Sequence, residues 1–306
     1  MIERPLILVT NDDGIDSDGL WAAVDAVLPL GEVLVVAPDR QWSGGGRSMP
    51  PDATGRITPA TRIVDGERVV AYAVDASPAL AVVHGVIELA PRPPALVVSG
   101  VNFGINLGIE VTISGTVGAA LEGGAFGIPA LAVSLEMDQA YHLTGDDAAD
   151  YAAAIAFTRH FARNLLACAL PRDMDALNVN IPADATPGTR WRLTRLSRLR
   201  YFIPIPPDRA RGKGRPGYKL IEDLGQVEPD SDVWAVLGDR VVSVTPLSLD
   251  LTSRVDVETV VPLLGTDVTG SLPMLWRVLL ASSSPECDAC LHPAGRYPTS
   301  GAGDTA

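Results

Sequence analysis

The chain has 306 residues and a formal net charge of −13, from 24 Lys and Arg against 37 Asp and Glu. This acidity argues against a nucleic-acid polymer as partner, because binding to a phosphate backbone depends on clustered cations. Only two cations are lysines, Lys213 and Lys219, and neither precedes Ser or Thr in a glycine-rich loop, which excludes a Walker-type ATP site. Hydrophobic residues at 47% and charged residues at 20% are typical of a packed globular protein.

The sequence favours a protein of the cytoplasm without a membrane span. Its three cysteines are too few for a disulfide framework, which indicates a reducing compartment. The apolar run from Pro5 to Val9 is too short for a signal peptide. The stretch from Val111 to Leu135 is apolar apart from Glu122, but its glycines and Pro129 favour a buried helix followed by a buried strand.

Over the first 135 residues, short β-branched runs alternate with stretches of helical spacing. Continuous apolar strands joined by helices predict a parallel sheet covered on both faces, and therefore a Rossmann-like, doubly wound α/β domain. The expected elements, in chain order, are the strand Pro5 to Thr10, the helix Ser17 to Leu30, the strand Val33 to Ala37, a hairpin of Thr61 to Val64 and Arg68 to Val74 turning at Asp65-Gly66, the helix Ser77 to Leu89, the strand Ala95 to Ser99, a helix from Ser114 and the strand Ala130 to Ser134.

The second half of the chain begins in the same way and then changes character. A long helix and one more buried strand are followed by segments that resemble antiparallel strands and by an excursion rich in proline and arginine. We expect a catalytic core over residues 1–185, a hairpin or arm with a return to the core over 186–253, and an extension over 254–306 with a disordered end. The segments are the helix Asp146 to Leu170, the strand Leu177 to Ile181, the antiparallel strands Arg192 to Thr194, Val233 to Val236 and Val241 to Thr245, and the excursion Tyr201 to Gly217, which we expect outside the core.

Polar residues follow the first buried strand as Asn11-Asp12-Asp13-Gly14. Two adjacent carboxylates repel each other unless a cation holds them, so the pattern indicates a metal site. Two other interpretations remain open from the residues alone. The segment is also typical of an Asx turn that caps the next helix, and either aspartate has the chemistry of a phosphate-accepting nucleophile.

Three further segments carry oxygen ligands or anion donors at expected strand ends. Ser43 offers a hydroxyl beside three glycines, whose backbone N–H groups can approach a small anion. Asn102 and Asn106 alternate with glycines after the strand that ends at Ser99. Ser114-Gly115-Thr116 opens a helix of small residues, and such a helix start binds phosphate without a lysine. Because the carboxyl ends of parallel strands share one edge, we expect these groups to converge.

Together these segments resemble the signature motifs of the SurE family, in the same order over about residues 5 to 253. The resemblance implies a Rossmann-like fold and a cytoplasmic, metal-dependent phosphatase that acts as a 5′/3′-nucleotidase with some activity on short polyphosphate. It also implies a homodimer or a dimer of dimers in which a C-terminal arm reaches a partner. The matching segments are Ile7 to Gly14, Ala37 to Arg40 with Ser43-Gly44, Ser99 to Asn102, Ser114 to Ala120, Leu177 to Pro182, and Val242 to Leu247 with Leu251-Thr252.

The resemblance also implies roles for single residues. Asp12, Asp13, Ser43 and Asn102 match the family's ligands for one divalent cation per subunit, and an all-oxygen set suits Mg²⁺ or Mn²⁺ better than zinc. The phosphate then lies on Ser114, Gly115 and Thr116, with Asn106. The chain departs from the pattern around the expected leaving-group pocket: Arg47 stands where the family often has His, and segments 76–81 and 109–111 also differ.

The hypothesis is therefore hydrolysis of a nucleoside monophosphate or another small phosphomonoester, with Asp12 and Asp13 as the catalytic pair. A metal orients or activates a water for in-line attack, and Asp12 takes the proton. A covalent aspartyl-phosphate is the alternative route. The alternative function is a non-catalytic phosphate- or nucleotide-binding module on the same fold, and a receiver-like signalling domain is disfavoured by the near absence of lysine.

Overall fold

The structure is a computed structural model that describes residues 4–137 and 149–256, except 210, 211, 213, 215 and 222, together with 259, 260 and 263. The chain divides into two compact units, Met1–Asp250 and Leu251–Ala306, and the fold below is that of the first. The expected disorder at the C-terminal end falls outside the described residues. No helix in the described ranges is long and apolar enough to cross a membrane.

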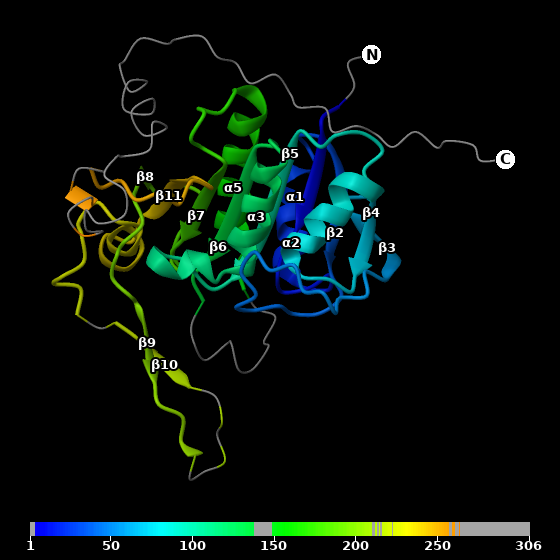
Figure 1. Ribbon diagram of the computed structural model, residues 1–306. Helices are drawn as coiled ribbons and strands as arrows, with labels where there is room; N and C mark the ends of the chain where they lie inside the picture. The colour runs from blue at the N-terminus through cyan, green and yellow to red at the C-terminus, as the bar shows by residue number, and fades with distance from the viewer. Residues whose placement is uncertain are drawn as a thin grey trace, which may run out of the picture. The chain divides into compact units, whose positions relative to one another are not determined.

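One nine-stranded sheet forms the centre of the first unit, in the order β3-β4-β2-β1-β5-β6-β7-β11-β8 (Figure 1). From β4 to β7 all neighbours are parallel, while β3 is antiparallel to β4 and β11 is antiparallel to β7. The predicted α/β class with a largely parallel sheet is confirmed. The strands of this sheet are β1 Leu6–Thr10, β2 Glu32–Pro38, β3 Ile57–Val64, β4 Glu67–Val74, β5 Leu96–Phe103, β6 Ala130–Leu135, β7 Ala176–Ile181, β8 Trp191–Leu193 and β11 Val242–Leu247.

Helices cover both faces of the sheet, as continuous apolar strands require. One core packs α1 and α5 against one face, and a second core packs α2 and α3 against the other. Alternate residues of each strand feed the two cores, so that Ile7 and Val9 enter the first while Leu6 and Leu8 enter the second. The helical elements are α1 Asp18–Val27, α2 Pro78–His84 with its π-helical continuation η1 Gly85–Leu89, the 3₁₀ turn η2 Gly108–Thr112, α3 Gly115–Ala125, α5 Ala152–Ala167 and the π-helical turn η4 Trp234–Gly238.

The predicted antiparallel hairpin lies in the C-terminal part of the first unit. β9 Phe202–Ile205 and β10 Gly217–Leu220 pair in antiparallel fashion as a separate two-stranded ribbon. Figure 1 shows this ribbon extending away from the nine-stranded sheet. The expectation that the excursion lies outside the core is wrong for Tyr201, which is 1% exposed in a small third core around η4.

Three other expectations about this half of the chain are corrected. Residues 233–236 are not a strand, because Val233 at the N-cap of η4 and Val236 within η4 are three residues apart and both pack in the third core. β8 is parallel to β11, not antiparallel. In the described residues the long helix begins at Ala152, later than expected, because residues 149–151 are not helical.

Candidate active site

The polar motifs meet where the order of the strands reverses. β2 lies on one side of β1, and β5, the next parallel strand along the chain after β4, lies on the other. Thr10, the last residue of β1, is the register partner of Ser99 on β5. Ligand sites of open α/β sheets form at the carboxyl ends of strands on either side of such a reversal. The segments that follow β1 and β5 are therefore neighbours.

The Asx-turn interpretation of the first motif applies to Asn11 and not to the aspartates. Asn11 Oδ1 accepts a hydrogen bond from the Gly14 N–H at 3.2 Å, and its Nδ2 donates to Gly14 O at 3.0 Å. Ser17 Oγ caps α1 by accepting from the Leu20 N–H. Helix capping therefore uses neither carboxylate.

Asp12 lies against the N-terminus of α3. Its side chain accepts a hydrogen bond at Oδ1 from Thr116 Oγ1 at 2.5 Å. A Cβ added at Gly115 would lie 2.7 Å from Asp12 Oδ2, so only glycine permits this approach of helix and carboxylate. Asp12 is 5% exposed. Burial is the larger cause, and the charge of Asp13 the next, of a rise in the pKa of Asp12 to about 7. The hydrogen bond from Thr116 acts in the opposite direction and lowers this pKa.

Asp13 joins the segment that follows β2 to the last residue of β5. Its Oδ1 accepts from Gln41 Nε2 at 3.2 Å, and its Oδ2 accepts from the Phe103 N–H at 3.1 Å. The neighbouring Trp42 N–H donates to Asp12 O at 2.7 Å. Ser43 and Asn102 are the other two expected cation ligands. Ser43 follows Trp42 and Asn102 precedes Phe103, so each is adjacent in sequence to a residue that contacts the aspartates.

A bulge in β5 helps to place Asn102. The expectation that this strand ends at Ser99 is wrong, because β5 continues to Phe103 through a register shift in its pairing with β6 between Ser99 and Asn102. Gly100 lies in this bulge with φ +128°, and a Cβ there would be 2.3 Å from Val133 O. Asn102 Nδ2 donates to Gly104 O at 2.7 Å, so its amide nitrogen is engaged within its own turn.

The expected phosphate residues divide into two groups. Ser114 caps α3 through a hydrogen bond from the Val117 N–H to Ser114 Oγ at 3.1 Å, and Gly115 and Thr116 follow in the first turn beside Asp12. Asn106 follows β5 and is instead hydrogen-bonded to Ser134 on β6 and Asn180 on β7. The positive end of the helix dipole favours an anion at this terminus.

Sequence reasoning missed the residues that hold Asn106. Its backbone N–H donates to Asn180 Oδ1 at 2.7 Å, and its backbone oxygen accepts from Asn178 Nδ2 at 2.9 Å and Asn180 Nδ2 at 3.0 Å. Asn106 Nδ2 donates to Ser134 Oγ at 2.9 Å. Two asparagines at alternate positions of an otherwise apolar strand are the signal that would have found this cradle.

The family model of survival protein SurE matches residues 7–202. The chain belongs to the SurE family. It is 44% identical to a 5′-nucleotidase SurE of Thermococcus gammatolerans over 82% of this chain and 93% of that protein. It is 41% identical to a 5′-nucleotidase SurE of Methanosarcina mazei over 82% of this chain and 95% of that protein. The crystal structure of the SurE protein from Aquifex aeolicus matches with a TM-score of 0.63 and 34% identity, covering 84% of this chain and 97% of that one.

The donor set of this SurE chain fits a hard divalent cation. Asp12 and Asp13 are adjacent carboxylates, and the segments that carry Ser43 and Asn102 are hydrogen-bonded to them. All four expected ligands offer oxygen atoms, which hard divalent cations prefer. A cation would relieve the desolvation and repulsion that raise the pKa of Asp12. The described residues contain no group of three or more His, Cys, Asp and Glu side chains suited to a metal, so two of the four expected ligands, Ser43 and Asn102, are of other types.

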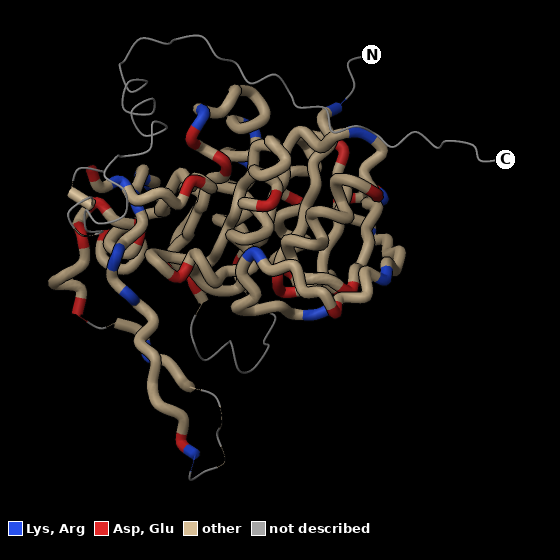
Figure 2. The backbone as a smooth tube through the Cα atoms, in the orientation of Figure 1, with Lys and Arg blue, Asp and Glu red and all other residues tan. Residues whose placement is uncertain are grey.

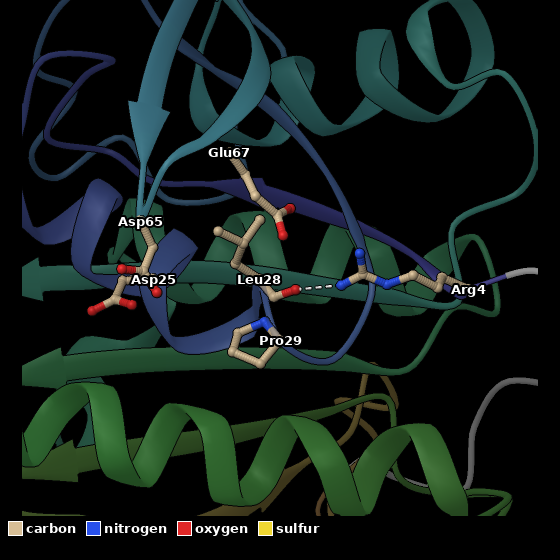
Figure 3. Close-up of a pocket in the computed structure, with 6 residues that line it drawn as sticks. All are labelled: Arg4, Asp25, Leu28, Pro29, Asp65 and Glu67. Atoms are coloured by element: carbon tan, nitrogen blue, oxygen red, sulfur yellow. Dashed lines mark hydrogen bonds between the residues drawn. The ribbon is translucent and has the colours of Figure 1, made fainter.

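A hollow at the other end of the SurE sheet has no part in this site. Arg4, Asp25 and Glu67 line it, with Arg4 donating to Leu28 O at 2.6 Å (Figure 3). Arg4 precedes the first residue of β1, whereas Asp12 and Asp13 follow its last. The hollow is therefore at the amino end of the strands, away from the polar groups described above.

Proposed function

We propose that this chain is a divalent-metal-dependent phosphomonoesterase that hydrolyses nucleoside 5′-monophosphates. The observation that carries the proposal is the contact between the buried Asp12 and the first turn of α3, made by Thr116 Oγ1 and permitted by Gly115. This contact brings a carboxylate pair for a cation next to a helix terminus for a phosphate. The relatives described as 5′-nucleotidases supply the substrate class.

In the proposed reaction a water attacks phosphorus, its bond to phosphorus forms, and the bond to the leaving ribose oxygen breaks. When bound by Asp12, Asp13, Ser43 and Asn102, a divalent cation supplies positive charge to the phosphoryl oxygens. The first turn of α3 holds the phosphate by its N–H groups. Asp12 accepts the proton of the water, and the leaving ribose oxygen takes up a proton from solvent. The products are the nucleoside and inorganic phosphate.

The finer parts of the proposal are one Mg²⁺ or Mn²⁺ per subunit, and activity on 3′-nucleotides and short polyphosphate. We also propose a cytoplasmic homodimer or homotetramer in which the β9–β10 ribbon contacts a partner. Ile205 and Tyr218 on this ribbon are 42% and 52% exposed, and apolar exposure of this kind favours a partner surface. Sedimentation analysis of the wild type and of a Tyr218→Ser variant tests the assembly, and a monomeric wild type contradicts it.

Small anions rather than nucleic acids suit the charge of the molecule. Figure 2 shows Lys and Arg positions along the segment that leads into β9, and Asp and Glu positions along the segment that follows β10. Arginines in this region face acids: Arg195 Nε lies 2.6 Å from Asp230 Oδ2, and Arg192 lies 2.7 Å from Asp239 Oδ2. Aspartates of the same chain offset the charge of these two arginines. We therefore propose no nucleic-acid partner.

The test is hydrolysis of AMP and of p-nitrophenyl phosphate with and without EDTA, in the wild type and in Asp12→Asn and Asp13→Asn. We expect loss of activity with EDTA, which removes the cation, and in both variants, each of which replaces one of its carboxylate ligands. Asp16→Asn is the matched control, since Asp16 is an exposed aspartate of the same loop. Retained activity in either active-site variant contradicts the assignment. A metal-binding wild type without turnover supports the alternative of a non-catalytic phosphate-binding module.

Rapid quench combined with labelled water separates the two chemical routes. In a single turnover in ¹⁸O-water, direct attack transfers the label to phosphate and forms no phosphoenzyme. An aspartyl-phosphate intermediate is trapped as a phosphoenzyme by rapid quench, and it labels the aspartate only when it is hydrolysed by attack on carbon, since attack on its phosphorus also labels phosphate. We expect no phosphoenzyme.

A further inference from the structure

Residues 43–47, called the glycine loop below, carry Ser43 at one end. The other end of this loop, at Gly46 and Arg47, contacts α3 and the residue before its cap. The Gly46 N–H donates to Ile113 O at 3.0 Å, just before the start of α3. A Cβ at Gly118 would lie 2.5 Å from Gly46 O, so the loop packs directly on the backbone of the helix. Arg47 Nε donates to Glu122 Oε2 at 2.6 Å, farther along the same helix.

The Arg47–Glu122 ion pair is partly shielded from water. The Glu122 side chain is 8% exposed and that of Arg47 is 40% exposed. A carboxylate buried to this degree needs a cationic partner, and a guanidinium held by it has little freedom to move. Because Arg47 ends the glycine loop, the ion pair fixes where the loop leaves α3.

The tip of the loop has few contacts of its own. Ser43 and Gly44 are exposed, and a Cβ added at Gly44 would meet nothing within 4 Å. The position of the tip is therefore set by its attachments, namely the Trp42 N–H to Asp12 O at 2.7 Å on one side and the contacts of Gly46 and Arg47 on the other. The helix whose first turn contacts Asp12 thus also holds the loop that presents Ser43.

We propose that Arg47 is a positioning residue: its ion pair with Glu122 holds the glycine loop on α3 so that Ser43 presents its hydroxyl to the cation bound by Asp12 and Asp13. The inference rests on the proposed function, because it requires a cation at that site. If the ion pair were only structural, its loss would lower stability without a specific change in cation affinity. In the proposal its loss lowers cation affinity, because Ser43 is displaced. Outer-shell partners of this kind set ligand geometry and thereby affinity.

The first measurement is Mn²⁺ affinity, by electron paramagnetic resonance or calorimetry, in the wild type, Arg47→Ala and Glu122→Gln. We expect both variants to bind Mn²⁺ about tenfold more weakly, and Arg47→Lys, which keeps the charge, to recover part of the loss. Arg92→Ala is the control, because Arg92 makes a 2.7 Å ion pair with Glu32 at the amino end of β2, away from the site. An unchanged affinity in Arg47→Ala and Glu122→Gln overturns the inference.

The second measurement is a double-mutant cycle with Ser43→Ala. If Arg47 acts through Ser43, removing Arg47 weakens Mn²⁺ binding in the wild-type background and has no further effect in Ser43→Ala. Additive losses overturn the inference and leave the proposed function standing. Absence of Mn²⁺ binding in the wild type overturns both. Glu122→Gln, which preserves side-chain size, replaces Arg47→Ala in the cycle if the latter does not fold.

Discussion

Asp12→Asn should make the metal-free protein more stable at alkaline pH while it abolishes activity. Asp12 is buried beside the charge of Asp13, and these two causes, in that order, raise its pKa to about 7 from the ordinary 3.8. Asparagine is neutral at every pH and nearly isosteric, and its Oδ1 can still accept the hydrogen bond from Thr116. The substitution therefore removes the cost of the buried charge with little other change.

The magnitude follows from linkage between protonation and folding. Below pH 3.8 the carboxyl of Asp12 is protonated in both the folded and the unfolded chain, and its contribution to stability is fully present. As the pH rises, the unfolded chain releases the proton first, so the folded protein loses about 1.4 kcal/mol per pH unit until the pH passes about 7. The total is about 4 kcal/mol, of which about 3 kcal/mol accumulates between pH 5 and pH 8.

The assay is urea unfolding in EDTA at pH 5 and pH 8, followed by tryptophan fluorescence. We expect the stability difference between Asp12→Asn and the wild type to grow by about 3 kcal/mol over this interval, and Asp16→Asn to follow the wild type at both values. Saturating Mn²⁺ should stabilise the wild type and not Asp12→Asn, because only the native carboxylate pair binds it. Parallel pH dependences in Asp12→Asn and the wild type would refute the reasoning.

Three further substitutions test separate contacts. Gly115→Ala puts a Cβ 2.7 Å from Asp12 Oδ2 and should lower kcat/KM roughly 100-fold in a protein whose circular dichroism is unchanged. Thr116→Val removes the hydrogen bond that lowers the pKa of Asp12. The pH at which Mn²⁺ affinity, measured by calorimetry, falls to half should therefore rise by about one unit. Thr116→Ser keeps the hydroxyl and should leave this pH unchanged. Asn180→Ala removes two hydrogen bonds to the backbone of Asn106 and should raise KM for AMP about tenfold with Mn²⁺ affinity unchanged. An equal loss of Mn²⁺ affinity would contradict the separation of Asn106 from the proposed cation ligands.

Local features of the fold could be predicted because each depends on a few consecutive residues. The turn at Asp65-Gly66 is an example, since both residues adopt positive φ, 51° and 79°, as the hairpin requires. Ser114 caps α3 because its hydroxyl reaches the N–H of Val117, three residues later. Buried apolar strands such as β1 were predicted for the same reason.

Features set by distant parts of the chain could not be predicted in the same way. The apolar run 233–236 is compatible with a strand or a helical turn, and its packing with Tyr201 decides in favour of the turn. The position of β11 between β7 and β8 could not be predicted, because the sequence of a single strand does not specify its neighbours in the sheet. At the site, the three segments that we propose for the cation were visible in the sequence, but the link from Asn106 to Asn180 spans 74 residues and required the sheet.

Cation and phosphate should bind this site cooperatively. The phosphate would lie on the first turn of α3, which Asp12 already contacts through Thr116, so an ionised Asp12 repels the anion while a cation on Asp12 and Asp13 attracts it. None of these motifs contains a lysine that could supply that charge, since the two lysines of the sequence are at 213 and 219. We therefore expect calorimetry to show that Mn²⁺ strengthens phosphate binding and that phosphate strengthens Mn²⁺ binding by the same factor, as linkage requires. Equal phosphate affinity with and without Mn²⁺ would place the anion elsewhere.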